Sequence, residues 1–193
     1  MTEPSPARRG YHHGNLKDAL LDAARDLVAT QGPAGFTLAE ASRRAGVSAS
    51  APYRHFKDRD ALLAALAERG FALFAQDLEQ AFDGGKPDAA TAFGRVGDAY
   101  LAFARREPGL YGAMFAICRP DGAKVPEAGR SFQVLVDAAR QAAGGIAVSD
   151  DRILAIWALA HGAATLAAAG HLTDAQAHAV LRGALAPQPP RDA

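Results

Sequence analysis

Residues 36–56 decide the fold of the N-terminal part of the chain, and they read FTLAEASRRAGVSASAPYRHF. Thr37 and Glu40 have the spacing of a capping box, which predicts a helix over 38–44. Gly46 is free to adopt the left-handed conformation that a tight turn needs. Ser48 or Ser50 then caps a further short helix that runs through residue 56. Two short helices joined in this way predict a helix-turn-helix, which lays its second helix in the major groove of DNA. An ordinary corner between two bundle helices is the alternative.

The residues after the turn favour the nucleic-acid interpretation. Tyr53, Arg54, His55 and Lys57 surround Phe56. Phe56 is expected in the core, whereas the four polar side chains are costly to hold together unless they face solvent or an anion. Phosphate is the anion that such a cluster fits best.

Two residues of the segment make its helices irregular. Pro52 is the fourth helical residue if Ser48 is the N-cap, and it then removes the first intrahelical hydrogen bond. If Ser50 is the cap, Pro52 is the second residue, whose amide has no helical partner in any case. Either way we expect a short recognition helix with an irregular start. The hydroxyl of Ser42 is expected to bond back to the previous turn of its own helix.

The rest of the chain is also predicted to be helical, because it is rich in alanine and has no alternating strand pattern. The expected fold is all-α with about nine helices. Apolar spacing and turn signals predict the other helices over residues 15–31, 58–82, 88–107, 108–117, 126–143, 150–169 and 173–185. We divide the chain into a flexible N-terminal arm (1–14), a helix-turn-helix DNA-binding domain (15–57), a helical domain (58–186), to which the family resemblance described below assigns ligand binding and dimerisation, and a frayed tail (187–193).

Composition narrows the class of protein. The 193 residues carry 21 Lys and Arg against 21 Asp and Glu, so the net charge is zero and argues against indiscriminate binding of nucleic acid. Cys118 is the single cysteine, which excludes an internal disulfide, and we interpret it as a small buried hydrophobe.

No secretory signal and no membrane span is predicted. No arrangement typical of an enzyme is found, and no catalytic or metal-binding residue and no cofactor is predicted. His12 and His13 lack further ligands at metal-binding spacing.

Residues 15–70 resemble the DNA-binding domain of the TetR-type bacterial transcriptional regulators. The pattern of that family is a capping Thr, an Ala-Gly-Val-Ser turn, and Tyr-x-x-Phe followed by a basic residue. The matching positions here are Thr37, residues 45–48, Tyr53, Phe56 and Lys57. A subgroup carries a Trp-x-x-x-His-Gly (WHG) element, which Trp157, His161 and Gly162 match, and residues 10–16 also look like that subgroup.

The resemblance implies three kinds of DNA contact. Thr37, Tyr53, His55 and Lys57 would contact phosphates. The start of the third helix would approach base edges through Ser48, Ala49, Ser50, Ala51 and Arg54. The arm would reach the neighbouring backbone or minor groove through Arg8, Arg9, Tyr11, His12 and His13. Because the two alanines offer no hydrogen bonds, thymine-methyl contacts and DNA shape would supply part of the readout.

The resemblance also implies an apolar effector pocket in the middle of the chain. Its candidate lining is the cluster of aromatic residues with one methionine and one histidine: Phe71, Phe74, Phe103, Tyr111, Met114, Phe115, Phe132, Trp157 and His161. Most of these are equally consistent with an ordinary core. For His161 the alternatives are a polar group in the pocket and a core histidine bonded to a backbone carbonyl.

The helix predicted over 150–169 is apolar on nearly every side, so it is buried within the chain or against a partner. With the last helix it resembles the four-helix dimer interface of the same family. The candidate interface residues are Ala160, Ala163, Ala164, Ala167, Ala168, Val180 and Leu181. The alternative is a buried central helix of a monomer.

The sequence therefore predicts a homodimeric, cytoplasmic, nucleoid-associated bacterial regulator. It would act as a repressor on a pseudo-palindromic double-stranded operator and would be released by a small apolar ligand. The alternative is a small-molecule-binding or adaptor protein of the same fold that does not read DNA, for which the zero net charge and Pro52 speak.

Overall fold

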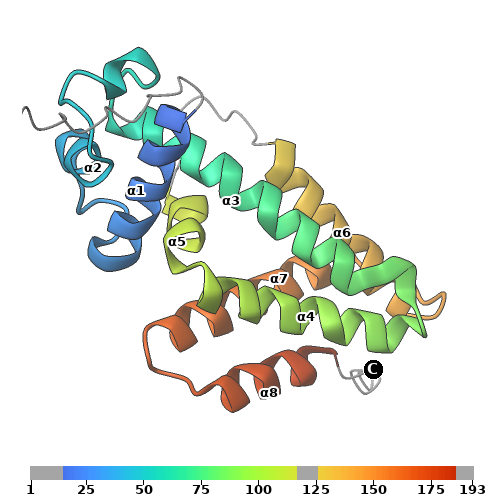
Figure 1. Ribbon diagram of the computed structural model, residues 1–193. Helices are drawn as coiled ribbons and strands as arrows, with labels where there is room; N and C mark the ends of the chain where they lie inside the picture. Colours follow the sequence, from blue (N-terminus) through green and yellow to red (C-terminus); the bar gives the residue numbers. More distant parts are fainter. Residues whose placement is uncertain (1–14, 117–125, 186–193) are drawn as a thin grey trace, which may run out of the picture.

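The computed structural model describes residues 15–116 and 126–185, and every regular element within those residues is a helix. Eight α-helices and two single turns of 3-10 helix follow one another along the chain (Figure 1). Their bounds are α1 Asn15–Gln31, α2 Leu38–Arg44, η1 Pro52–Arg54, α3 Arg59–Phe82, η2 Asp83–Gly85, α4 Ala89–Arg106, α5 Pro108–Ala116, α6 Pro126–Ala142, α7 Asp150–Ala168 and α8 Asp174–Leu185. The all-α prediction is confirmed. The arm, the tail and Cys118 lie outside the described residues.

Side-chain caps explain where most of these helices begin. The Thr37 hydroxyl accepts from the backbone N–H of Glu40, whose carboxylate accepts from the N–H of Thr37 at 2.9 Å, so the predicted capping box is present. Asp58 and Asp88 cap α3 and α4 in the same manner. Ser149 caps α7 by accepting from the backbone N–H of Arg152, and the helix begins at residue 150.

The N-terminal unit consists of α1, α2, η1 and the first turns of α3. Leu20, Phe36, Phe56 and Leu62 are fully or almost fully buried at its centre, which confirms the prediction for Phe56. The guanidinium of Arg59 lies 6.0 Å from the centre of the Phe36 ring and covers this core at the start of α3.

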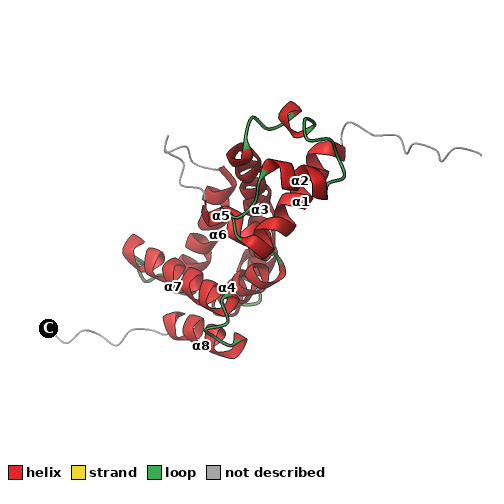
Figure 2. Cartoon of the chain, turned by 90° about the vertical axis from the view of Figure 1, so that its left-hand side faces the viewer, coloured by secondary structure: helices red, strands yellow, loops and turns green. Residues whose placement is uncertain are grey.

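The longest helix, α3, connects this unit to the rest of the molecule (Figure 1). Its 24 residues extend about 36 Å at 1.5 Å per residue. Beyond the N-terminal unit, α3 packs against α4, α5 and α6, and α4 packs against α7 and α8. Figure 2 shows α1 and α2 at one end of the molecule and α8 at the other. The bundle therefore reaches the N-terminal unit through α3 and through α5, which also packs on α1.

Candidate nucleic-acid interface and ligand pocket

The turn after α2 is a Schellman motif built on Gly46. The N–H of Gly46 donates to the carbonyl of Arg43 at 3.2 Å, and the N–H of Val47 donates to the carbonyl of Ser42 at 3.0 Å. Gly46 has a φ of +68°, which an L-residue adopts only with strain. Inside α2 the Ser42 hydroxyl donates to the carbonyl of Leu38 at 2.8 Å, as predicted.

The predicted recognition helix is one turn of 3-10 helix rather than an α-helix. Neither Ser48 nor Ser50 caps it; their hydroxyls lie 3.3 Å apart, and Ala51 is the N-cap. Pro52 is the first helical residue and is buried. A proline here fits because its missing N–H would have no helical partner. The turn closes when the N–H groups of residues 55 and 56 both donate to the Pro52 carbonyl at 2.9 Å.

This turn presents polar side chains outward from a buried base. Tyr53 is 64% exposed although it is aromatic, and Arg54, His55 and Lys57 are exposed beside it. Lys57 makes only a loose ion pair, with its Nζ 3.8 Å from Asp58 Oδ2. The four polar side chains of the predicted cluster are therefore accessible to solvent at one turn of the chain. Ser48, Ala49 and Ser50 are exposed next to it, and Ala51 is half-buried.

Thr37 is exposed as well, but its hydroxyl already has a partner. Besides accepting from the Glu40 N–H, it donates to Glu40 Oε2 at 3.0 Å. A phosphate at Thr37 would have to compete with this capping box for the hydroxyl proton. Arg9 and Tyr11 belong to the arm, which lies outside the described residues.

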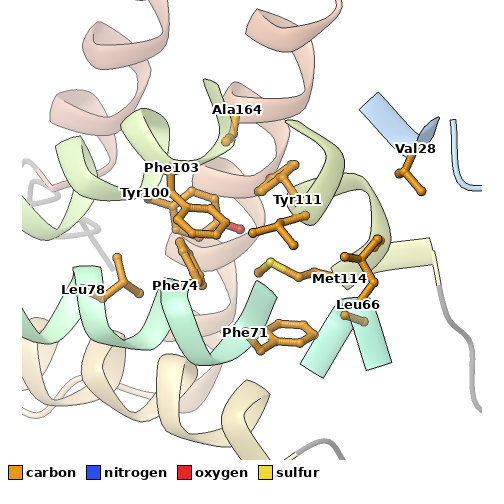
Figure 3. Close-up of a cluster of buried hydrophobic side chains, with 14 of the residues drawn as sticks. Val28, Leu66, Phe71, Phe74, Leu78, Tyr100, Phe103, Tyr111, Met114 and Ala164 are labelled. Atoms are coloured by element: carbon orange, nitrogen blue, oxygen red, sulfur yellow. The ribbon is translucent and has the colours of Figure 1, made fainter. Parts of the chain in front are cut away.

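A cavity of about 320 Å³ lies inside the helical bundle. Figure 3 draws four of its lining side chains, Phe71, Phe74 and Leu78 from α3 and Tyr100 from α4. Five predicted pocket residues line the cavity: Phe71, Phe74, Phe115, Phe132 and Trp157. Further lining residues were not predicted: Leu78, Phe93, Val96, Gly97, Tyr100, Ala128, Ser131, Leu135, Ile156, Ala160 and Leu181.

The other four predicted pocket residues pack behind the wall, which corrects their assignment. Phe103 is fully buried against the ring of Phe74, with the ring centres 5.0 Å apart. Met114 fills the space that Gly70 leaves on α3, where a Cβ would come within 2.8 Å of its Cγ. Tyr111 and His161 form a polar contact just outside the lining.

His161 is half-buried in an aromatic surrounding. It is stacked between Trp157 and Tyr111, and the ring of Phe115 meets it edge-on at 4.4 Å. Its Nδ1 lies 2.9 Å from the hydroxyl of Tyr111 and 3.5 Å from that of Tyr100. The partners of this ring nitrogen are thus tyrosine hydroxyls and not the backbone carbonyl considered from the sequence.

Burial sets the protonation of this group. Desolvation lowers the pKa of His161, so the imidazole is neutral near pH 7. Desolvation also raises the pKa of both tyrosines above their ordinary value, so their hydroxyls keep their protons. The wall of the cavity near Tyr100 therefore carries hydrogen-bonding groups without charge.

The apolar face of α7 that remains exposed differs from the predicted interface. Ala160, Ala163 and Ala164 are buried inside the single chain, where α7 packs on α4, and Leu181 of α8 is buried too. Their burial leaves little surface of these four side chains for a partner. The opposite face of α7 exposes Leu154, Leu159 and Leu166, and α8 exposes Val180. Of the other predicted residues, Ala167 is half-buried and Ala168 is exposed.

Residues 15–116 and 126–185 contain neither a candidate metal-binding cluster nor a candidate membrane-spanning helix. No three His, Cys, Asp or Glu side chains within them are grouped to hold a metal ion. None of their helices combines the length and the apolar character that crossing a membrane requires.

Both halves of the chain match known families. Residues 20–66 match the family described as bacterial regulatory proteins of the tetR family, and residues 93–186 match the tetracyclin repressor-like C-terminal domain. The two matches cover the helix-turn-helix and most of the bundle that holds the cavity.

Individual relatives agree with these matches. The solved structure of a protein with unknown function from a Rhodococcus species is 36% identical, with a TM-score of 0.76, over 92% of this chain and 95% of that one. The HTH-type transcriptional regulator AlkX of Mycobacterium tuberculosis is 26% identical over 106 residues, or 55% of this chain and 50% of AlkX. This chain spans half or less of the length of the curated relatives it matches.

A more distant structure shares the fold alone. It is the transcriptional regulator FadR of Bacillus subtilis in complex with stearoyl-CoA, which is 15% identical with a TM-score of 0.70, over 88% of this chain and 97% of that one. With family matches in both halves and a helix-turn-helix at one end of an all-helical fold, the chain belongs to the TetR family of bacterial transcription regulators.

Proposed function

We propose that this protein is a homodimeric repressor that binds a pseudo-palindromic operator in the bacterial cytoplasm and releases it when a small apolar ligand enters the bundle. The observation that carries the proposal is an exposed polar group beside the Schellman motif, on a turn whose first residue, Pro52, is buried. The group consists of Tyr53, Arg54, His55 and Lys57. Exposed cations and hydroxyls in this setting suit phosphate oxygens and base edges. The Trp157, His161 and Gly162 element supports the WHG subgroup.

Dimerisation follows from the exposed face of α7. Leu154, Leu159 and Leu166 remain open to solvent on a helix whose other face is buried. A contiguous apolar face of this kind marks an interaction site. A two-fold operator has two half-sites, so a second copy of the chain is the partner that it requires. Each copy would contact one half-site through its N-terminal unit (α1, α2 and η1), which we call the reading head.

The path from ligand to DNA runs along α3. The helix begins at the Asp58 cap, directly after the exposed group, and its residues Phe71, Phe74 and Leu78 line the cavity. A ligand that shifts these side chains also tilts the helix on which the reading head sits. The ligand must prefer one spacing of the two heads, because equal affinity for both spacings shifts nothing.

The test is selection of bound fragments from the parent genome with purified protein at two salt concentrations. An inverted repeat whose binding falls steeply at the higher salt supports a dimeric DNA reader. If no sequence is enriched at either salt, with or without candidate ligands, the proposal is wrong and the chain is a small-molecule-binding protein of this fold.

Substitutions in the exposed group separate base contacts from phosphate contacts. We expect Arg54→Ala to relax sequence preference at one operator position, at a cost of about 1–3 kcal/mol for a bidentate base contact. Lys57→Ala should weaken binding to all DNA sequences about equally and reduce the slope of log affinity against log salt concentration by about one. Titrations of operator and scrambled duplexes at several salt concentrations measure both effects.

A matched control for these variants is Lys86→Ala. Lys86 is an exposed cation in the turn between α3 and α4, at the end of α3 away from the reading head. Its substitution should leave DNA binding unchanged. Unaltered DNA binding in both Arg54→Ala and Lys57→Ala contradicts the assigned interface.

A further inference from the structure

The wall of the cavity is rich in aromatic rings. Seven of its sixteen described lining residues are aromatic, and they come from α3, α4, α5, α6 and α7. Several pair at nearly right angles: Phe74 with Tyr100 at 89° and Phe132 with Trp157 at 89°. Each such pair offers both a ring face and a ring edge. A flat aromatic guest can therefore stack on one ring and meet the edge of another, which saturated molecules cannot do.

The lining also excludes charge on the guest. None of the described lining residues is Asp, Glu, Lys, Arg or His. A carboxylate or ammonium group in this cavity would lose its hydration without gaining a charged partner, which is strongly unfavourable. The neutral state of His161 behind the wall leaves no cation on that side chain for an anion to meet.

The hydroxyl of Tyr100 is the hydrogen-bonding group best placed to recognise a guest. Its hydrogen bond to His161 Nδ1 is long, at 3.5 Å, whereas Tyr111 holds the same nitrogen at 2.9 Å. Tyr111 makes the better hydrogen bond to this nitrogen, and the Tyr100 hydroxyl also hydrogen bonds with that of Tyr111. Of these three side chains only Tyr100 belongs to the lining of the cavity, so its hydroxyl is the one that an oxygen of a guest can reach.

The other hydroxyl of the lining, on Ser131, has a different role. It donates to the carbonyl of Ala128 at 2.9 Å, so its proton is engaged in a short hydrogen bond within its own helix. Its lone pairs are open to a guest. A guest oxygen therefore replaces the 3.5 Å contact of Tyr100 with His161 more readily than the bond of Ser131.

We propose that the ligand is an uncharged aromatic molecule with one phenolic or carbonyl oxygen, and that Tyr100 is the residue that selects this oxygen. The proposal rests on the proposed function, since it describes the ligand of the same cavity. The volume of 320 Å³ is near the lower end of the range of about 300–1,000 Å³ for ligand pockets, which suits a molecule of about two fused rings.

Four matched probes test the class by calorimetric titration of the full chain. The probes are 2-naphthol, naphthalene, 2-naphthoate and the saturated alcohol decahydro-2-naphthol. We expect 2-naphthol to bind about fivefold tighter than naphthalene, from one added hydrogen bond. It should bind severalfold tighter than the saturated alcohol and at least about 30-fold tighter than the anionic naphthoate.

The variant Tyr100→Phe tests the residue, because it removes one hydroxyl and keeps the ring. The advantage of 2-naphthol over naphthalene should disappear, while naphthalene binding stays within about twofold of the parent and shows that the pocket is intact. Ala128→Phe places a ring at the half-buried wall and should weaken all probes, which locates their binding in this cavity.

The outcomes distinguish the two proposals. If naphthoate or the saturated alcohol binds as tightly as 2-naphthol, or if Tyr100→Phe keeps the preference for 2-naphthol, this inference is wrong and an apolar ligand site remains. If none of the four probes binds, the inference and the apolar-effector part of the proposed function are both wrong.

Discussion

The substitution Leu159→Asp should convert the proposed dimer to a monomer and weaken operator binding by about 100-fold or more. Leu159 is 42% exposed on the outer face of α7, and Leu166 lies on the same face two turns later with 45% exposed. In a two-fold interface each substitution occurs twice, and each new carboxylate would be buried without a partner. The loss of operator affinity follows because a monomer binds one half-site, whereas linked heads gain about 10²–10⁴ from their effective concentration.

The matched control is Leu73→Asp. Leu73 is a leucine of α3 with a similar exposure of 38%, but it does not lie on α7 or α8. The same change in polarity there should leave the dimer and operator binding intact. Sedimentation equilibrium gives the oligomeric state, and titration of a labelled operator gives the affinity. A Leu159→Asp protein that remains dimeric places the interface elsewhere.

Local signals made the N-terminal unit predictable from the sequence. The capping box, the glycine of the turn and the back-bonding serine each depend on a few neighbouring residues, so one chain contains all the information they need. The same holds for the aspartate caps that begin α3 and α4. Helix ends elsewhere are also within about one residue of their predicted positions where the structure describes them.

The turn around Pro52 was harder to predict because two possible caps competed in the sequence. Neither serine provides the cap, and the proline ring is buried instead. The turn that contains Pro52 packs against α1, which is distant in the sequence. A single 3-10 turn results where a short α-helix was expected.

The helical spacing of apolar residues could not distinguish those that line the cavity from those that pack in the solid core. Val96, Tyr100 and Phe103 recur at helical spacing on α4, yet the first two line the cavity and the third is packed solid against Phe74. Which apolar side chain faces the cavity depends on how six helices meet. The partner of a small residue was equally hard to predict. Ala160 and Ala163 allow close approach of any neighbouring helix, whether it belongs to the same chain or to a second copy. They serve packing within the chain rather than between chains.

The joint between α1 and α5 should be the most sensitive point of the fold. Gly109 of α5 is buried so closely against α1 that a Cβ added to it would lie 2.0 Å from the backbone carbonyl oxygen of Arg25. Three residues later, a Cβ at Gly112 would lie 3.2 Å from a methyl group of Val28. Because backbone atoms of a helix cannot rotate away as a side chain can, α1 must move off α5 to admit even one methyl group.

We therefore expect Gly109→Ala to destabilise the protein by about 2 kcal/mol or more, since overpacking outweighs the gain in helix propensity of about 1 kcal/mol. Gly94→Ala is the matched control, because Gly94 also lies inside a helix but a Cβ added there would meet no neighbouring atom within 4 Å. That variant should be stabilised by about 0.5–1 kcal/mol. Urea unfolding at one fixed protein concentration measures both, because dimer stability depends on concentration. If Gly109→Ala is as stable as the parent, α1 can move away from α5 without loss of stability. The N-terminal unit is then connected to the cavity through α3 alone.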